Sequence, residues 1–269
     1  EAVLAAGDHY LAKLGQTTGV PEAERIHTAI MSLGLAELSP FDPQDKIIEY
    51  RYRGAPSGLK AMRLYEFADE LSSDSPAPGG GSVAALCGSL SASLSAMVAA
   101  LSWSKKGVEE RRPAMLRIGG QGQALKDWFV NAVDADTDAF NAVIAARRLP
   151  KKTDDEKQAR AAAIERANQE ATRVPLRVLE RCVEALDLAA EVAAQGNPAS
   201  VSDAGVAGAC ALAAAEGAAL NVRINLPGLT DRKAAGEISE RQIGLLKQSR
   251  EKAERVREIV DEVLDRSTE

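Results

Sequence analysis

The sequence predicts an all-α protein, built as a bundle of long helices that are rich in small residues. Aromatic residues are only 4% of the 269 residues, and alanine is abundant in the second half, which favours closely packed helices over a sheet. From Met62 onward the sequence has a helical pattern. Glycine and proline separate the long helical stretches, as expected for the connections of a bundle.

Six helices are expected in this part of the chain. Their ranges are Leu64–Leu71, Val83–Trp103, Pro113–Ala146, Asp154–Ala189, Ser202–Asn221 and Asp231–Leu264. Gly119, Gly120 and Gly122 should interrupt or loosen the third helix, and Pro175 should kink the fourth. The second and fifth carry few large side chains, so their backbones can approach closely. We expect these two helices to form the tight centre of the bundle.

The first fifty residues differ from the rest. A helix over Glu1–Leu14 and a second one between Pro21 and Gly34 precede Lys46–Tyr52, whose β-branched and aromatic residues predict a strand. So small an α/β unit is expected to pack against further chain. The expected divisions are an N-terminal unit at 1–53, a linker at 54–61 and a helical domain at 62–269.

Composition narrows the possible partners. Acidic residues outnumber basic ones by 39 to 33, so nucleic acid is not an expected partner. Val83–Trp103 lacks charge, but its five serines indicate a core helix rather than a membrane span. Cys87, Cys182 and Cys210 have neither disulfide nor zinc spacing and are expected to be buried, reduced thiols. With no visible secretory signal, we expect a cytoplasmic protein.

The stretch Asp74–Ser82 is the most distinctive motif. Two prolines and then Gly79, Gly80 and Gly81 lead into a helix for which Ser82 is the expected N-cap. Successive glycines expose backbone N–H groups, and a helix N-terminus favours negative charge, so the segment suits an anion. A flexible linker or a tight turn remains an alternative.

Candidate acid–base chemistry points to one aspartate. The two histidines, His9 and His27, precede the helical domain, which must therefore use a carboxylate, lysine, cysteine or backbone group. Among the acids near residue 136, helical spacing puts Asp136 in the middle of an apolar stripe and leaves Asp134 and Asp138 as surface acids. Desolvation should raise the proton affinity of Asp136. It is either a general acid or a buried residue that caps or pairs with a neighbour.

Further polar residues could bind a ligand. Lys105, Lys106 and the lysines after Pro150, including Lys151, could neutralise an anion or simply be solvated helix ends. The remaining candidates border or follow the second small-residue helix, where capping is the alternative: Asn197, Ser202, Asp203, Asn221 and Asn225.

The order and spacing of these motifs resemble the formiminotetrahydrofolate cyclodeaminase family, which includes methenyltetrahydrofolate cyclohydrolases. The resemblance covers about Met62 to Leu264. The segments that carry it are Ser75–Ala85, Lys105-Lys106, Val133–Asp136, Ala139-Phe140, Leu149–Lys151, Val174–Leu176, Gly196-Asn197, Ser202-Asp203 and Leu220–Leu226. The first part resembles the C-terminal end of a glutamate formiminotransferase, through Ser32–Leu35, Pro40–Pro43 and Lys46–Tyr50.

The resemblance implies a helical domain that forms a homodimer or a higher homo-oligomer, binds folate or folylpolyglutamate, shares its site between subunits and needs no metal or cofactor. It implies Asp136 as the proton donor in converting 5-formiminotetrahydrofolate to 5,10-methenyltetrahydrofolate and ammonia. The glycine turn and lysines would hold glutamyl carboxylates, and the asparagines would meet the pterin. A formiminotransferase domain is the expected upstream partner. Two alternatives are methenyltetrahydrofolate cyclohydrolase activity and a non-catalytic helical oligomerisation module.

Overall fold

The computed structural model describes residues 1–37, 39–53, 57–105 and 109–266. The α-helices in these ranges are α1 (Ala2–Lys13), α2 (Glu22–Ser32), α3 (Pro43–Lys46), α4 (Ile48–Arg53), α5 (Leu64–Leu71), α6 (Gly80–Trp103), α7 (Arg112–Arg147), α8 (Asp154–Gln195), α9 (Val201–Asn225) and α10 (Arg232–Arg266). The described residues contain no strand, so the all-α fold is confirmed and the expected strand at Lys46–Tyr52 is wrong.

The supposed strand is two short helices, and local chemistry explains why. The Asp42 carboxylate accepts a hydrogen bond from the Gln44 amide at 2.9 Å, and Pro43 suits the first helical position, so a helix begins there. Ile47 is extended between the two helices and packs in a small core with Ile26 and Ile30 of α2. Of the apolar residues that resembled a strand, Ile47 is thus buried from the extended link between the two helices, whereas Ile48 and Tyr52 are exposed.

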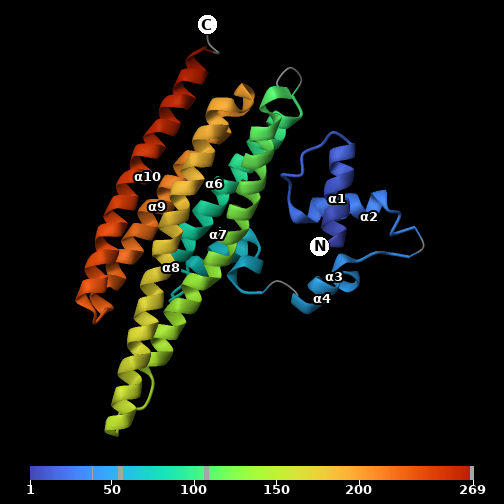
Figure 1. Cartoon of the computed structure of the whole chain (residues 1–269). Coiled ribbons are helices and arrows are strands. Elements are labelled where there is room, and N and C mark those ends of the chain that lie inside the picture. Colours follow the sequence, from blue (N-terminus) through green and yellow to red (C-terminus); the bar gives the residue numbers. More distant parts are fainter. Residues whose placement is uncertain (38, 54–56, 106–108, 267–269) are drawn as a thin grey trace.

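The long helices form a bundle (Figure 1). Helices α6 and α9 pack against each other; α7 and α8 cover α6, while α8 and α10 cover α9. The ends of α7 and α8 that meet near residues 147–154 project beyond the other helices (Figure 1). The turn between them is fixed by Thr153 and Glu156, which form a capping box at the start of α8.

The prediction of a tight α6–α9 centre is half right. A Cβ at Gly217 of α9 would lie 3.1 Å from the Ala84 side chain of α6, so these backbones do approach closely. In this single chain, however, large side chains on the outer side of both helices are solvent-exposed, for example Leu90 and Leu220. By length and composition alone α6 and the segment 198–228 could cross a membrane, and about half of each apolar window is buried in the bundle.

Glycines do not interrupt α7, which runs unbroken past Gly119 and Gly122. Instead they allow close contacts. A Cβ at Gly122 would lie 3.0 Å from the Ala92 carbonyl of α6, and one at Gly119 would lie 3.2 Å from the Gly19 Cα. The loop after α1 is thus packed backbone to backbone on α7. Helix α8 is likewise continuous through Pro175.

Part of the expected linker is ordered. Residues 54–56 lie outside the described residues, but Leu59–Ala61 forms a short 3₁₀ helix against α7. The Lys60 amide donates to the Asp134 carboxylate at 3.3 Å, and the Lys60 ammonium lies 3.6 Å from it. Only Asp138 is the exposed surface acid predicted; Asp134 holds the linker to the bundle.

Candidate functional site

A cavity of about 570 Å³ lies where the N-terminus of α6 meets the C-terminus of α9. Its walls come from the glycine turn, the middle and end of α7, the middle of α8, and the end of α9 with the turn that follows. Of the sequence-predicted site residues it gathers Gly79, Gly80, Gly81, Asp136, Asn221 and Asn225.

The glycine turn enters the helix earlier than expected. Gly79 occupies the N-cap position and the helix begins at Gly80, so Ser82 is not the N-cap but lies in the first turn. Its side chain is fully buried and its hydroxyl donates to the Val133 carbonyl of α7 at 3.0 Å. Ser82 therefore ties the α6 N-terminus to the segment of α7 that carries Asp136.

Asp136 lies directly against this first turn. Its Oδ2 is 3.3 Å from the Ser82 hydroxyl. A Cβ at Gly81 would overlap the Asp136 carboxylate, so only glycine allows this approach. The apolar stripe of α7 that contains Asp136 includes Phe129 and Val133, which are buried, and Phe140, which is 40% exposed and lines the cavity. The stripe thus runs from the core to the cavity wall, with Asp136 at the boundary.

The pKa of Asp136 is raised above its ordinary value of 3.8. Burial, which penalises the charged form, is the largest cause, and hydrogen bonds from the Ser82 side chain and backbone oppose it. Asp136 therefore combines contact with a neighbouring helix end and a raised pKa, and its role as a general acid stays a prediction. A carboxyl group of this kind at a cavity is suited to donate a proton.

The two asparagines of α9 that line the cavity are half-buried. The Asn221 amide donates to the Gly217 carbonyl at 2.8 Å. The Asn225 amide donates to the Ala171 carbonyl of α8 at 2.7 Å. That carbonyl has no helical partner because the residue four positions on is Pro175, which lacks an N–H group. Asn225 thus supplies the hydrogen bond that Pro175 cannot, and α8 remains helical at the cavity.

Sequence reasoning missed three polar residues of the cavity, which are Thr137, Arg147 and Asn168. Arg147, at the end of α7, lines the cavity and is the cationic side chain among the described lining residues. Asn168 of α8 also lines it and donates to the Gly228 carbonyl at 2.8 Å. Arg147 lies seven residues beyond Phe140, on the same helical face, and this spacing was the available signal.

Among the residues that the structure describes, the other predicted ligand residues do not line this cavity in a single copy of the chain. Lys105 donates to the Asn197 side chain at 2.9 Å, and that side chain accepts from the Ala199 amide. Ser202 and Asp203 begin α9, and 18 residues separate Asp203 from Asn221, about 27 Å of helix. Lys151 is exposed in the α7–α8 turn, and Lys106 lies outside the described residues.

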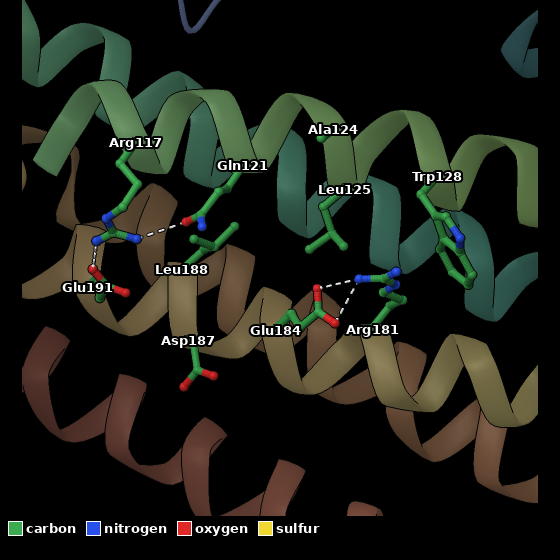
Figure 2. A pocket seen from close by; sticks show the side chains of 10 residues that line it. All are labelled: Arg117, Gln121, Ala124, Leu125, Trp128, Arg181, Glu184, Asp187, Leu188 and Glu191. Carbon is green, nitrogen blue, oxygen red and sulfur yellow. Dashed lines mark hydrogen bonds and ion pairs between the residues drawn. The ribbon is translucent and has the colours of Figure 1, made fainter.

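A second cavity, of about 520 Å³, lies between α7 and α8 (Figure 2). Its charged groups are already paired. Arg117 binds Glu191, and Arg181 binds Glu184 at 2.7 Å while stacking over Trp128. Asp187 binds Lys252 of α10. None of the predicted site residues lines it, whereas six of them line the cavity beside Asp136, which is therefore the candidate site.

All three cysteines were expected to be buried, and this prediction is correct for one of them. Cys182 is buried, but Cys87 and Cys210 are partly exposed. Burial raises the pKa of all three thiols, most for Cys182, so none is activated as a nucleophile.

The fold and the site define a helical-bundle enzyme domain in which a buried carboxyl group meets a glycine-capped helix end. Comparison with known sequences identifies the family: residues 63–242 match the family model described as Formiminotransferase-cyclodeaminase, and the chain belongs to that family. Residues 1–53 match a second model, described as Formiminotransferase domain.

Two curated relatives illustrate the range of the family. The chain is 42% identical over 194 residues to the Methenyltetrahydrofolate cyclohydrolase of Methylorubrum extorquens, covering 72% of this chain and 93% of that protein. It is 34% identical over 253 residues to the Formimidoyltransferase-cyclodeaminase of Gallus gallus, covering 93% of this chain and 47% of that protein. The chain thus spans about half the length of the formimidoyltransferase-cyclodeaminases that it matches.

A solved structure has the same fold. The formiminotetrahydrofolate cyclodeaminase from Thermotoga maritima superposes with a TM-score of 0.69 at 25% sequence identity. The similarity covers 77% of this chain and the whole of that one.

Proposed function

We propose that this chain is a formimidoyltetrahydrofolate cyclodeaminase, which converts 5-formiminotetrahydrofolate to 5,10-methenyltetrahydrofolate and ammonia. The observation that carries the proposal is the carboxyl group of Asp136, with its pKa raised by burial, at the edge of a cavity of about 570 Å³. The similarity to proteins named cyclodeaminase supports the reaction class.

The chemistry requires ring closure and loss of one nitrogen. The folate N10 attacks the formimino carbon, and the bond from that carbon to the departing nitrogen breaks. Ammonia needs three hydrogens: one is already on the formimino nitrogen, one comes from N10 and one from protonated Asp136. The product carries a delocalised positive charge, which the Asp136 carboxylate then stabilises. Solvent returns the proton to Asp136.

The rest of the cavity would position the substrate. Holding N10 against the formimino carbon is an intramolecular problem, which a rigid cavity between packed helices can solve. The exposed amides at Gly79 and Gly80 and the Arg147 guanidinium can hold carboxylates of the glutamyl tail. Asn221 and Asn225 can meet polar groups of the pterin.

Cyclohydrolase activity, which opens the methenyl ring with water to give 10-formyltetrahydrofolate, is the second candidate. The 42% identity to the Methylorubrum protein of that name, over nearly its whole length, favours it. The N-terminal match to a formiminotransferase domain favours deamination, because such a domain would supply formimino groups. We therefore place deamination first, in a protein where formimino transfer precedes it, as in histidine degradation.

The deciding experiment is to incubate the chain with 5-formiminotetrahydrofolate and follow methenyltetrahydrofolate by absorbance together with released ammonia. Equal amounts of both products are expected. No reaction with this substrate, together with consumption of added methenyltetrahydrofolate, would replace the deaminase by the cyclohydrolase. Inactivity towards both would reject an enzyme in this chain by itself.

A further inference from the structure

A further cavity, of about 610 Å³, lies where the end of α9 meets α10, and we call it the α9–α10 cavity. It shares no lining residue with the candidate active site. The turn after α9 separates the two, because Leu226 lines the α9–α10 cavity whereas Pro227 and Gly228 line the candidate site. A cavity of this volume is large enough for a small organic molecule.

The lining of the α9–α10 cavity is cationic, although the whole chain has a net charge of −6. Arg223, Lys247 and Arg250 line it together with one acid, Glu251. Arg250 lies 3.0 Å from Glu216 and Lys247 lies 3.8 Å from Glu251, so two of the cations have acidic partners. Arg223 is exposed and forms no ion pair with a residue that the structure describes. Its guanidinium is therefore available to an anion.

Two polar side chains of the cavity also lack partners. The Gln242 side chain is 2% exposed, yet its amide forms no hydrogen bond with the described part of the chain. Ser239 lies three residues earlier on the same side of α10, and its hydroxyl has no such bond either. Folded proteins rarely leave a buried amide without a partner, because its desolvation is then uncompensated. A bound ligand would supply the missing hydrogen bonds.

The rest of the lining is apolar. Leu226 and Leu246 are half-buried there, and Ile243 is 62% exposed. The cavity between α7 and α8 differs, because its arginines already bind acidic side chains (Figure 2). The α9–α10 cavity thus combines a free cation, free hydrogen-bonding groups and an apolar surface, as small-molecule sites do.

We propose that the α9–α10 cavity binds a small organic anion, in which a carboxylate or phosphate group is attached to an apolar body. The Arg223 guanidinium binds the anionic group, to which it can donate two parallel hydrogen bonds. Gln242 and Ser239 bind neighbouring polar atoms of the ligand. The apolar body packs on Leu226 and Leu246. This site is independent of the proposed function.

The test measures binding by isothermal titration calorimetry at fixed ionic strength, in the absence of folate. The probes are phenyl phosphate and benzoate, which carry the two kinds of anionic group on the same ring, and benzyl alcohol, which is neutral. We expect at least one of the anions to bind with a Kd of about 1 mM or lower, and benzyl alcohol to bind more weakly. The tighter of the two anions identifies the anionic group.

Variants then locate the bound anion. Arg223→Gln should raise the Kd of the tighter anion by about 10-fold or more, because it removes charge-assisted hydrogen bonds. Arg173→Gln on α8 is the matched control, since Arg173 is exposed, has no ion pair among the described residues and lines neither cavity. Arg147→Gln alters the candidate active site instead. Both should change the Kd by less than about twofold.

Gln242→Met gives a second readout, because it removes the amide at similar side-chain volume. The Kd should rise by about threefold or more. Without ligand, the urea midpoint of this variant should rise above that of the unaltered chain, since the buried amide has no partner to lose. Circular dichroism checks that the helix content is unchanged. A lower midpoint would mean that Gln242 is a structural residue and would remove it from the site.

Three results would overturn the proposal. The first is that neither anion binds at millimolar concentration. The second is an equal loss of affinity in Arg223→Gln and Arg173→Gln, which would indicate a nonspecific response to surface charge. The third is a loss in Arg147→Gln but not in Arg223→Gln, which would place the anion in the candidate active site. Because binding is read without turnover, a chain inactive as a cyclodeaminase would leave this site unaffected.

Discussion

The two ends of the bundle contain similar residues in different states. At the cavity end, Asp136 is desolvated and Arg147 opens onto empty volume. At the opposite end, Lys105 is bound to Asn197, whose backbone amide in turn donates to Ser102. Asp136 and Arg147 therefore face a cavity that a ligand could fill, whereas Lys105 and Asn197 are used to join helices. Residue type alone does not distinguish a binding group from a capping group.

The largest expected effect is that of Asp136→Asn, which directly tests the role of the cavity end. Asparagine keeps the shape and the contact with Ser82 but cannot donate the catalytic proton. Turnover should fall by about 10²–10⁴-fold, the usual contribution of general acid catalysis, with little change in KM. Steady-state kinetics with 5-formiminotetrahydrofolate measures this, and full turnover in the variant would remove Asp136 from the mechanism.

A slightly smaller effect is expected from Gly81→Ala, because the added methyl group overlaps the Asp136 carboxylate. Displacing the carboxyl group by about 1 Å should lower turnover by about 100-fold. Gly79→Ala is the matched control, since a Cβ there meets nothing within 4 Å. Equal turnover in the two variants would mean that the close approach of α6 to Asp136 does not contribute to catalysis.

The contrast between the ends is sharpened by Arg147→Ala and Lys105→Ala. Loss of a charge-assisted hydrogen bond of about 1.5–3 kcal/mol should raise KM by about 10–100-fold for Arg147→Ala. For Lys105→Ala a change in KM below about threefold is expected, because Lys105 lies just beyond the C-terminus of α6, at the end away from the cavity. A comparable rise in KM for Lys105→Ala would show that the far end of a second copy reaches the cavity.

The smallest effect concerns stability. Because the folded protein holds the Asp136 proton at pH values where the unfolded chain releases it, its free energy of unfolding falls as pH rises from about 3.8 to the raised pKa. The Asp136→Asn variant lacks this pH dependence. Over this pH range its free energy of unfolding should therefore rise relative to that of the unaltered chain, by about 1.4 kcal/mol for each pH unit. Urea unfolding across this pH range measures the difference, and parallel curves would contradict the raised pKa.

The positions of the long helices and the partly buried environment of Asp136 could be predicted from the sequence, because both follow from the spacing of apolar residues. Apolar residues at helical spacing gave the helices after residue 62 to within a few residues at most ends, although α8 runs six residues further than expected. The same spacing singled out Asp136, whose pKa is raised as expected. Local patterns of this kind need no knowledge of the partner helix.

Other features depend on tertiary contacts and could not be predicted locally. The segment Lys46–Tyr52 suits a strand by composition, but Asp42 caps a helix that ends at Lys46, and a second helix begins at Ile48 after Ile47, which packs against α2. Glycines that look like helix breakers at Gly119 and Gly122 instead allow neighbouring backbones to approach. Whether two polar residues share a cavity depends on which ends of the helices meet there. Asp203 and Asn221 lie near opposite ends of α9, so they cannot line the same cavity.

The pairing of Pro175 with Asn225 has a consequence for how the protein can vary. The proline frees one carbonyl of α8, and the asparagine of α9 occupies it. Replacing Pro175 with alanine would restore a backbone N–H that competes for this carbonyl and releases the Asn225 amide into the cavity. Positions 175 and 225, which are 50 residues apart, should therefore co-vary through evolution. A substitution at either position would alter ligand selectivity although neither residue contacts the reacting atoms.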